Sequence, residues 1–162
     1  MDARIDVELY YNKYGPMVFR RCMQLLRAED DALDAMQDVF VNLLKQSKRL
    51  KGDYPSSLLY TMATNTCLNR FYTRKRQREN LVSEEQVEAV FLDNGYEKVN
   101  ARLLIEDIFR TESEVSRVIC FMHHVDGMTL EEIGNTVGLS ISGVRKRLIK
   151  FNKRAQAHLS KR

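Results

Sequence analysis

Apolar residues recur at steps of three and four along the start of the chain, a pattern typical of an amphipathic helix. The first such run covers residues 5–27 and repeats at Val7, Tyr10, Tyr14, Val18, Cys22 and Leu25. Pro16 falls inside this run, so we expect the helix to kink there or to divide into two. Arg20, Arg21 and Arg27 lie off the apolar stripe.

A second helix is predicted from the acidic residues Glu29, Asp30 and Asp31 to about Lys48. Acidic side chains suit a helix start, both as caps and against the helix dipole. The apolar stripe of this helix consists of Met36, Val39, Phe40, Leu43 and Leu44. The opposite face is polar and mostly acidic, with Asp31, Asp34, Gln37, Asp38 and Asn42. Taken alone, that face is typical of a solvated surface.

A third helix is predicted over residues 57–78, after a loop at residues 52–55 and with Ser56 or Ser57 as its cap. Its inner face consists of Leu59, Met62, Ala63, Thr66 and Cys67. Its end, residues 69–78, carries five basic residues interleaved with Phe71 and Tyr72. This mixture suits phosphate contacts and base stacking on opened nucleic acid. A solvated helix end would explain the charges but not the two aromatic residues.

Charge reverses over residues 79–100, where six acidic residues stand against Lys98 alone. We expect a linker there, partly helical over 84–90, followed by helices near 101–109 and 113–124. No alternating strand pattern is present in the sequence. The chain is therefore predicted to be all-α, with two small helical domains joined by an acidic linker.

The stretch from Gly127 to Arg154 predicts a helix-turn-helix. Thr129 and Glu132 form a capping box, and Leu130, Ile133 and Val137 then recur on one face. Gly134 is small enough for a second helix to cross closely, while Gly138 suits a left-handed residue that ends the helix. Leu139 is expected to fill the turn, and Ser140 to cap the next helix.

The second helix of this motif is basic. Ile141, Val144, Leu148 and Phe151 repeat the inward stripe, which leaves Ser142, Arg145, Lys146, Ile149 and Lys150 facing outward or to the flanks. No acidic residue follows Arg145, and eight lysines and arginines lie between there and the C-terminus. An ordinary αα-hairpin with a solvated basic face is the alternative. The glycine spacing and the basic tail favour a helix that enters the major groove of DNA.

The composition of the chain also limits which classes of protein it can belong to. The 162 residues carry a net charge of +4 and contain no long apolar run, so no transmembrane helix is expected. The N-terminus lacks the pattern of a signal peptide, which predicts a cytoplasmic protein without membrane insertion. Three widely spaced cysteines do not suggest disulfides. Cys120 with His123 and His124 raises a metal site as an alternative, but a packed helix with a free thiol is favoured, so no metal or cofactor is expected.

Several motifs, in order, resemble the small two-domain bacterial sigma factors of the extracytoplasmic-function group. Residues 31–40, DALDAMQDVF, are similar to that family's helix that docks on the β′ clamp of RNA polymerase. Residues 58–65, LLYTMATN, are similar to its W-L-Y-x-I-A-x-N segment. The basic residues through Arg78 and residues 113–154 resemble its −10 and −35 promoter-binding regions. The resemblance covers nearly the whole chain.

The resemblance implies a sigma factor that directs promoter-specific transcription initiation and is not itself an enzyme. It implies a region 2-like domain over 1–80, a linker over 81–100 and a region 4-like helix-turn-helix domain over 101–162. The implied partners are core RNA polymerase, through the β′ clamp helices and the β-flap, promoter DNA and an anti-sigma factor.

Matching positions give the expected site residues. The polymerase-binding residues are Asp31, Asp34, Gln37, Asp38 and Phe40. The −10 DNA-binding residues are Tyr60, Asn65, Asn69, Arg70, Tyr72, Arg74, Lys75 and Arg76, with Asn65 expected to hold a flipped base. The −35 DNA-binding residues are Ser142, Arg145, Lys146, Ile149 and Lys150.

Two other classes of protein remain alternatives. A homodimeric helix-turn-helix regulator would bind a palindromic operator without polymerase, but it would leave the acidic helix and the aromatic-basic helix end without a role. A nuclease or recombinase would need a nucleophile or clustered carboxylates beside the basic surface. The acidic residues of 29–38 instead have the spacing of a helix face, and no phosphate-binding loop is present.

Overall fold

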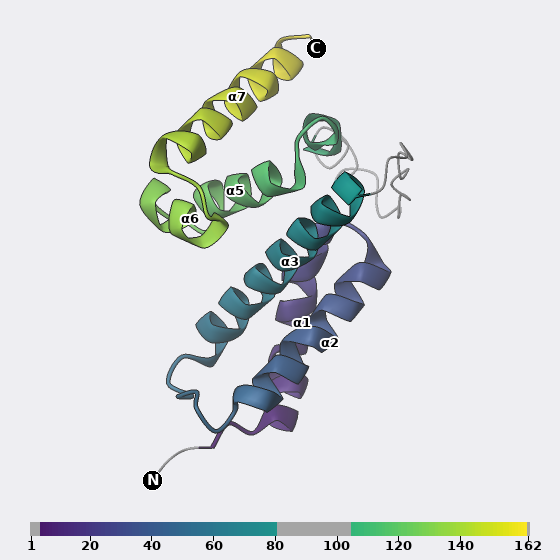
Figure 1. Ribbon diagram of the computed structural model, residues 1–162, viewed down its shortest axis with the longest axis vertical. Coiled ribbons are helices and arrows are strands. Elements are labelled where there is room, and N and C mark those ends of the chain that lie inside the picture. Colours follow the sequence, from purple (N-terminus) through teal and green to yellow (C-terminus); the bar gives the residue numbers. More distant parts are fainter. Residues whose placement is uncertain (1–3, 81–104, 162) are drawn as a thin grey trace. The chain divides into compact units, whose positions relative to one another are not determined.

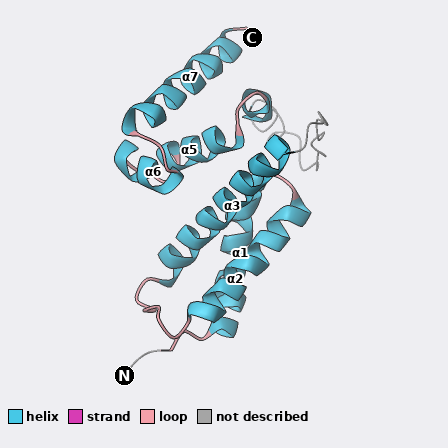
Figure 2. Cartoon of the chain, in the orientation of Figure 1, coloured by secondary structure: helices cyan, strands magenta, loops and turns pink. Residues whose placement is uncertain are grey.

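The protein forms two compact helical units, which divide the chain into Met1–Ala89 and Val90–Arg162. The structure, a computed structural model, describes residues 4–80 and 105–161. All regular structure in these ranges is helical, as the sequence predicted (Figure 2). The predicted linker over 81–100 and its helix over 84–90 lie outside the described residues. The start of the helix expected near 101–109 also lies outside the described residues. Its described part is helical over residues 105–110.

The first unit consists of three helices that pack side by side: α1 (Val7–Leu26), α2 (Glu29–Gln46) and α3 (Pro55–Asn80) (Figure 1). Asp6 caps α1 by accepting a hydrogen bond from the Leu9 amide at 3.0 Å. The helix continues through Pro16 without dividing, so the alternative of two helices is wrong. It ends at Arg27, whose positive φ of 61° gives the left-handed turn into α2.

The helix starts differ from the sequence prediction in α2 and α3. Ala28 occupies the N-cap position of α2 without a side-chain hydrogen bond, so Glu29, Asp30 and Asp31 act on the helix dipole from the first turn and not as caps. α3 begins at Pro55, whose fixed φ and missing amide hydrogen suit the first position of a helix. Ser56 and Ser57 therefore lie inside the first turn and do not cap the helix.

The core of the first unit is made by the facing apolar stripes of its three helices. It contains Val18, Cys22, Leu25, Ala35, Val39, Leu43, Leu59, Ala63, Cys67 and Leu68. Two predictions fail here. Leu44, expected in the core, is 62% exposed because the buried side of α2 is centred on Val39 and Leu43. Phe71, expected to stack on bases, is 2% exposed because it continues the inner stripe of α3 one turn beyond Cys67.

A charged side chain also enters this core. Arg21, which lies off the predicted apolar stripe of α1, is 1% exposed. Its Nε donates to the Thr64 hydroxyl at 3.1 Å, and that hydroxyl donates to the Tyr60 carbonyl at 3.0 Å. Because a buried guanidinium needs acceptors or a π face, Arg21 fixes α1 against α3 at one position along their length.

The second unit contains α5 (Glu114–His124), α6 (Leu130–Val137) and α7 (Ile141–Ser160). The capping box at the start of α6 is confirmed: the Thr129 hydroxyl accepts from the Glu132 amide at 3.2 Å, and the Glu132 carboxylate accepts from the Thr129 amide at 2.8 Å. Gly138 ends α6 with φ of 74°, and the Ser140 hydroxyl caps α7 by accepting from the Gly143 amide at 3.1 Å. The two-helix motif is therefore built on the predicted caps.

Gly134 allows the turn after α6 to pass close to the helix. We had predicted that it allows a second helix to cross closely. A side chain there would place its Cβ 2.7 Å from the Leu139 carbonyl oxygen, which belongs to the turn itself. The Gly134 carbonyl in turn accepts from the amides of Gly138 and Leu139. The chain thus folds back tightly on α6 before α7 begins.

The core of the second unit is formed by Val118, Ile119, Met122, Ile133, Val137, Val144 and Leu148. Phe109 stacks on Phe121 and Phe151, with ring centroids 5.8 and 5.3 Å apart, and closes one end of this core. Ile141 was expected to face inward but is 44% exposed, because it lies in the first turn of α7, one turn before the buried Val144. The inward stripe of α7 therefore begins at Val144.

Candidate nucleic-acid and protein interfaces

The acidic face of α2, which we define as Asp31, Asp34, Gln37 and Asp38, lies on the side of the helix away from the core. Asp34, Gln37 and Asp38 are exposed and Asp31 is half-buried. Leu33, Val41 and Leu44 are exposed on the same side, at 38, 48 and 62%. The face therefore presents exposed apolar side chains beside carboxylates. The sequence pattern missed this because Leu44 fits a helical core spacing equally well.

Phe40 needs a correction. It was placed among the polymerase-binding residues, but it is 6% exposed and its ring packs on Tyr11 with centroids 5.0 Å apart. Through its contact with Tyr11, Phe40 helps to hold α2 against α1. Because it is buried, Phe40 is not part of the exposed acidic face.

The eight residues expected to bind the −10 element do not form one surface. Four of them share a face of α3 at successive steps of four, three and four residues, and we call them the outer stripe: Asn65, Asn69, Tyr72 and Arg76. Asn65, Asn69 and Arg76 are exposed, and Tyr72 is half-buried. An amide, a second amide, an aromatic ring and a cation in one row suit contacts to base edges, base faces and phosphate.

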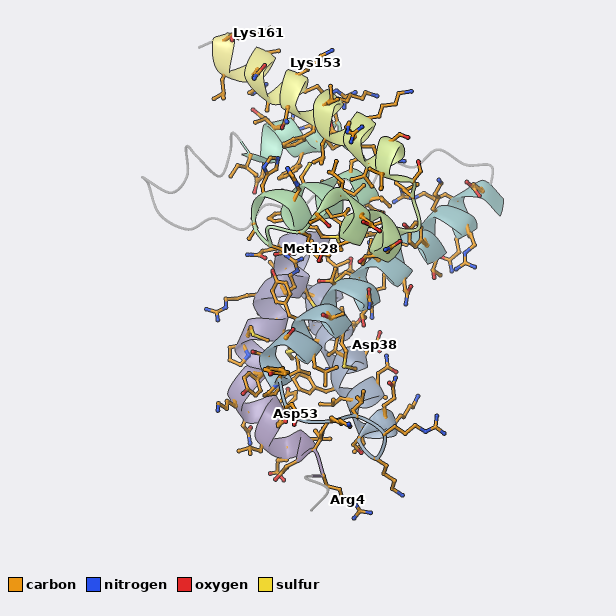
Figure 3. The ribbon with its side chains drawn as sticks, turned by 90° about the vertical axis from the view of Figure 1, so that its left-hand side faces the viewer. Arg4, Asp38, Asp53, Met128, Lys153 and Lys161 are labelled. Carbon is orange, nitrogen blue, oxygen red and sulfur yellow. The ribbon has the colours of Figure 1, made fainter. Side chains whose placement is uncertain are left out.

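Arg70 and Arg74 instead turn toward α2. Arg70 Nη2 donates to Asp38 Oδ2 at 2.7 Å, and Arg74 Nη2 donates to Asp31 Oδ2 at 2.6 Å. Both arginines line a groove of about 460 Å³ between α2 and α3, together with Asp38, Val41, Asn42, Lys45, Thr66, Asn69 and Thr73. The side chains around Asp38 are drawn in Figure 3. Two predicted DNA-binding residues are thus ion-paired with two predicted polymerase-binding residues.

Tyr60 and Lys75 lie on other sides of α3. The guanidinium carbon of Arg21 lies 4.3 Å from the centroid of the half-buried Tyr60 ring, so one face of that ring is occupied. Lys75 is exposed near the end of the helix, beyond the core. Of the eight residues, only the outer stripe is therefore arranged as one surface.

The residues expected to bind the −35 element form one basic arc on α7. Ser142, Arg145, Lys146, Ile149 and Lys150 are all exposed and occupy neighbouring helical positions opposite Val144 and Leu148. Lys153 is also exposed, and its helical position falls between those of Ile149 and Lys146 (labelled in Figure 3). Sequence reasoning missed Lys153, although a count of one residue per 100° would have placed it in the arc.

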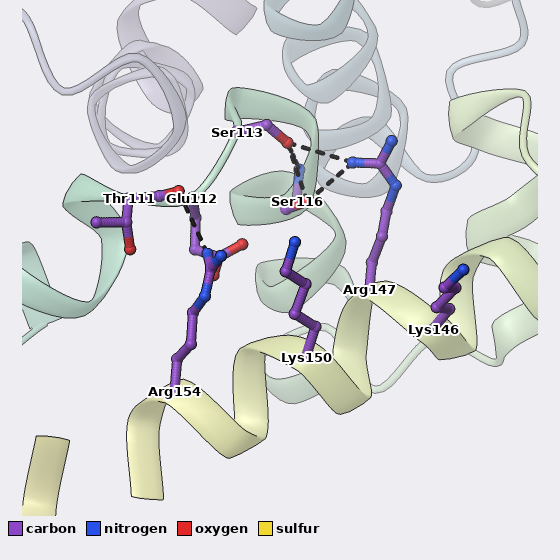
Figure 4. Close-up of a pocket in the computed structure, with 8 residues that line it drawn as sticks. All are labelled: Thr111, Glu112, Ser113, Ser116, Lys146, Arg147, Lys150 and Arg154. Atoms are coloured by element: carbon purple, nitrogen blue, oxygen red, sulfur yellow. Dashed lines mark hydrogen bonds and ion pairs between the residues drawn. The ribbon is translucent and has the colours of Figure 1, made fainter. Parts of the chain in front are cut away.

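Two arginines of α7 form hydrogen bonds and an ion pair within the second unit. Arg147 donates to the hydroxyls of Ser113 and Ser116 at 3.2 and 2.9 Å, and Arg154 pairs with Glu112 at 2.6 Å (Figure 4). These contacts lie along a pocket of about 370 Å³ between α7 and the start of α5, with Lys146 and Lys150 on its lining. Arg147 thus contacts the start of α5 and Arg154 the residue Glu112 just before it, so two of the eight basic residues of the tail are engaged inside the unit.

The three cysteines are free and buried. Cys22 and Cys67 hydrogen-bond to each other between α1 and α3, and this contact together with burial raises the pKa of Cys67. Burial, with the negative charge of Glu112, raises the pKa of Cys120 to about 12. No cluster of three metal-binding side chains occurs within residues 4–80 and 105–161. In the same ranges, no helix is long and apolar enough to cross a membrane.

Comparison with known proteins identifies the first unit. Residues 10–79 match the Sigma-70 region 2 family. Across 156 residues, 92% of this chain, the sequence is 23% identical to the ECF RNA polymerase sigma factor SigE of Mycolicibacterium smegmatis. The chain spans 60% of the length of that curated relative.

The fold agrees with these sequence matches. The chain is similar to the sigma factor RpoE of Bartonella quintana, whose crystal structure contains the anti-sigma factor NepR, with a TM-score of 0.63 and 18% identity. The similarity covers 96% of this chain and 97% of that one. Fold and site together define an all-helical protein whose first unit is a sigma-70 region 2 domain. Over 92% of its length, the chain is similar to a sigma factor of the extracytoplasmic-function group.

Proposed function

We propose that this protein binds core RNA polymerase and directs it to promoters by contacting their −10 and −35 elements. In this proposal, residues 1–80 act as region 2 and residues 101–162 as region 4, joined by the acidic linker over 81–100. The observation that carries the proposal is that the outer stripe of α3 and the basic arc of α7 lie in separate units. Two separate contacts on one DNA molecule raise the effective concentration of the second contact.

The acidic face of α2 is the proposed polymerase contact. Its carboxylates suit a basic partner, and Leu33, Val41 and Leu44 add apolar area that a purely solvated face would not need. Resemblance to the family assigns this partner as the β′ clamp helices, and assigns the β-flap to the second unit. The protein would act where the polymerase transcribes, in the bacterial cytoplasm.

The outer stripe is the proposed −10 reader. Asn65 is exposed, and its amide carries both donors and an acceptor, so it can pair with the edge of a base that has left the stack. Tyr72 and Arg76 follow it along the stripe and provide a ring and a cation for the adjoining nucleotides. Unstacking a base costs a few kcal/mol, and polymerase binding together with the −35 contact offsets this.

The basic arc is the proposed −35 reader. Ser140 caps α7 and Gly138 ends α6. Val144 then packs into the core, which leaves Ser142, Arg145 and Lys146 exposed on the opposite side of α7. Arginine and lysine can pair with guanine in the major groove, and Ile149 can contact a thymine methyl. The protein performs no chemical step in this account; the polymerase does.

A protein partner that blocks these surfaces is also proposed. The structure of RpoE from Bartonella quintana contains the anti-sigma factor NepR, and the shared fold supports a partner of that class for this chain.

Transcription in vitro tests the proposal. Core polymerase and this protein would be supplied with a pool of genomic fragments, and the start sites of the transcripts would be sequenced. We expect start sites that share two upstream elements and that need both proteins. Recovery of a palindromic site bound by the protein alone, with no polymerase-dependent transcripts, would instead favour the homodimeric regulator.

A further inference from the structure

The two ion pairs between α2 and α3 join surfaces that the proposed function assigns to different partners. Asp38 and Asp31 belong to the acidic face, whereas Arg70 and Arg74 belong to the basic end of α3. All four side chains are partly accessible, with exposures of 24% for Arg70, 56% for Asp38, 32% for Arg74 and 34% for Asp31. A partner can therefore reach either side of each pair.

We infer that these ion pairs are an autoinhibitory contact, in which the carboxylates that await polymerase hold back two arginines that would otherwise bind DNA phosphates. This inference rests on the proposed function. A basic polymerase surface that takes over Asp31 and Asp38 frees Arg70 and Arg74 at the same moment. Polymerase binding and DNA binding are then coupled through four side chains of one domain.

The chemistry of Arg70 supports an exchange of partners. Its Nη2 is engaged by Asp38, but its Nε is buried and lacks a hydrogen-bond partner within the described part of the chain. A guanidinium binds best when two of its N–H groups meet two acceptor oxygens in a fork. A DNA phosphate offers that arrangement, so Arg70 can form more hydrogen bonds with DNA than it forms now.

The position of the pairs supports the same exchange. They lie along the groove between α2 and α3, whose lining also includes Asn69 of the outer stripe. A DNA strand that follows the outer stripe therefore passes beside Arg70 and Arg74. These arginines need only turn away from α2, while the backbone of α3 stays in place.

The size of the effect follows from the partial exposure of the pairs. Ion pairs that water reaches are each modest, so two of them together should change DNA affinity by about three- to tenfold. Linkage requires the effect to be reciprocal: DNA should raise the affinity for polymerase by the same factor that polymerase raises the affinity for DNA.

Other carboxylates of α2 provide a matched control. Asp30 and Asp34 are exposed and have no ion-pair partner among the residues that the structure describes. Asp30, like Asp31, lies in the first turn of α2. The variant Asp30→Ala with Asp34→Ala therefore removes the same charge as Asp31→Ala with Asp38→Ala, including one first-turn carboxylate, but frees no arginine.

The test measures binding of the full chain, without polymerase, to a short fluorescent single-stranded DNA of mixed sequence. We expect the Asp31→Ala and Asp38→Ala variant to bind about three- to tenfold more tightly than the control variant. Its log affinity should fall more steeply with log salt, by about 1.4 for two added phosphate contacts. Adding Arg70→Ala and Arg74→Ala to that variant should abolish the gain. Equal affinities and salt slopes for the two carboxylate variants would overturn the inference.

A second comparison does not depend on the folding of the carboxylate variants. Arg70→Ala with Arg74→Ala alone should change DNA binding by the free protein less than about twofold, because both arginines are already engaged. The same variant, assembled with core polymerase, should bind promoter DNA clearly more weakly than wild type. A large loss of DNA binding in the free protein would show that the arginines are available, and would overturn the inference. Capture of core polymerase by wild type tests the proposed function separately, so the two failures are distinguishable.

Discussion

Arg21 and Tyr60 face each other between α1 and α3, with the guanidinium carbon 4.3 Å from the centre of the ring. The same arginine donates to Thr64, one turn further along α3. A buried cation that meets a ring face and a hydroxyl is favourable only when both are in place. Arg21 therefore restricts where the Tyr60 ring lies, in the part of α3 that precedes the outer stripe.

Replacement of Arg21 should weaken the first unit strongly. We expect Arg21→Met to lower its free energy of unfolding by about 2–4 kcal/mol, since it removes the interactions that fix α1 to α3 and leaves a poorly filled space. Thermal and urea unfolding followed by circular dichroism would measure this. Arg20→Ala is the control, because Arg20 is exposed and adjacent. Similar losses for the two variants would contradict the role assigned to Arg21.

The sequence predicted the features that depend on neighbouring residues. The capping box of Thr129 and Glu132, the left-handed Gly138 and the Ser140 cap are each defined within a few positions, and all three are present. Helical spacing likewise identified most of the core, because it needs only one helix at a time.

Features that depend on the packing of several helices were not predictable in the same way. Arg21 lies off its apolar stripe and Leu44 lies on one, yet the first is buried and the second exposed, because two neighbouring helices decide which side of each helix is covered. The pairing of Arg70 with Asp38 joins positions 32 residues apart. No local pattern reports such a contact.

Arg154 should stabilise the second unit through Glu112. The Glu112 side chain is 5% exposed and Arg154 is 39% exposed. Removal of the arginine leaves a nearly buried carboxylate without its ion-pair partner. We expect Arg154→Ala to lower stability by about 1–2 kcal/mol, less than for a fully buried pair. Hydrogen exchange of the α5 and α7 amides would detect this, with Lys150→Ala from the same pocket as the control. Unchanged protection in Arg154→Ala would refute it.

Because Cys120 is buried, we expect the second unit to lose stability at alkaline pH. Burial, and to a smaller extent the charge of Glu112, raises the pKa of Cys120 to about 12 in the folded protein. The pKa of a cysteine in an unfolded chain is about 8.5. The folded state thus favours the protonated thiol. Its contribution is fully present below pH about 8.5 and is lost progressively as pH rises toward 12. Unfolding of wild type and Cys120→Ala across this range should show the steeper decline in wild type. Parallel curves would argue against it.

The basic arc of α7 should account for the salt dependence of −35 binding. Lys146→Ala and Lys153→Ala each remove an exposed cation, so each should reduce the slope of log affinity against log salt by about 0.9 for duplex DNA. Titrations of duplex DNA at several salt concentrations measure this slope. Lys48→Ala, an exposed lysine of the first unit, should leave it unchanged. Equal slopes for wild type and the two variants would show that Lys146 and Lys153 do not contact DNA phosphates.

Asp34 provides the most direct test of whether the acidic face of α2 binds core RNA polymerase. Asp34 is exposed and has no ion-pair partner within the described residues, so Asp34→Arg reverses a charge on that face without disturbing Arg70 or Arg74. Asp53→Arg, on the exposed loop before α3, is the control.

The measurement is capture of core polymerase by the tagged protein and its two variants. We predict stoichiometric capture by wild type and Asp53→Arg, and capture reduced at least about tenfold by Asp34→Arg because a repulsive charge replaces an attractive one. Capture of polymerase by Asp34→Arg equal to that of wild type would contradict the assignment of this face, and failure of folded wild type to bind polymerase would contradict the proposed function itself.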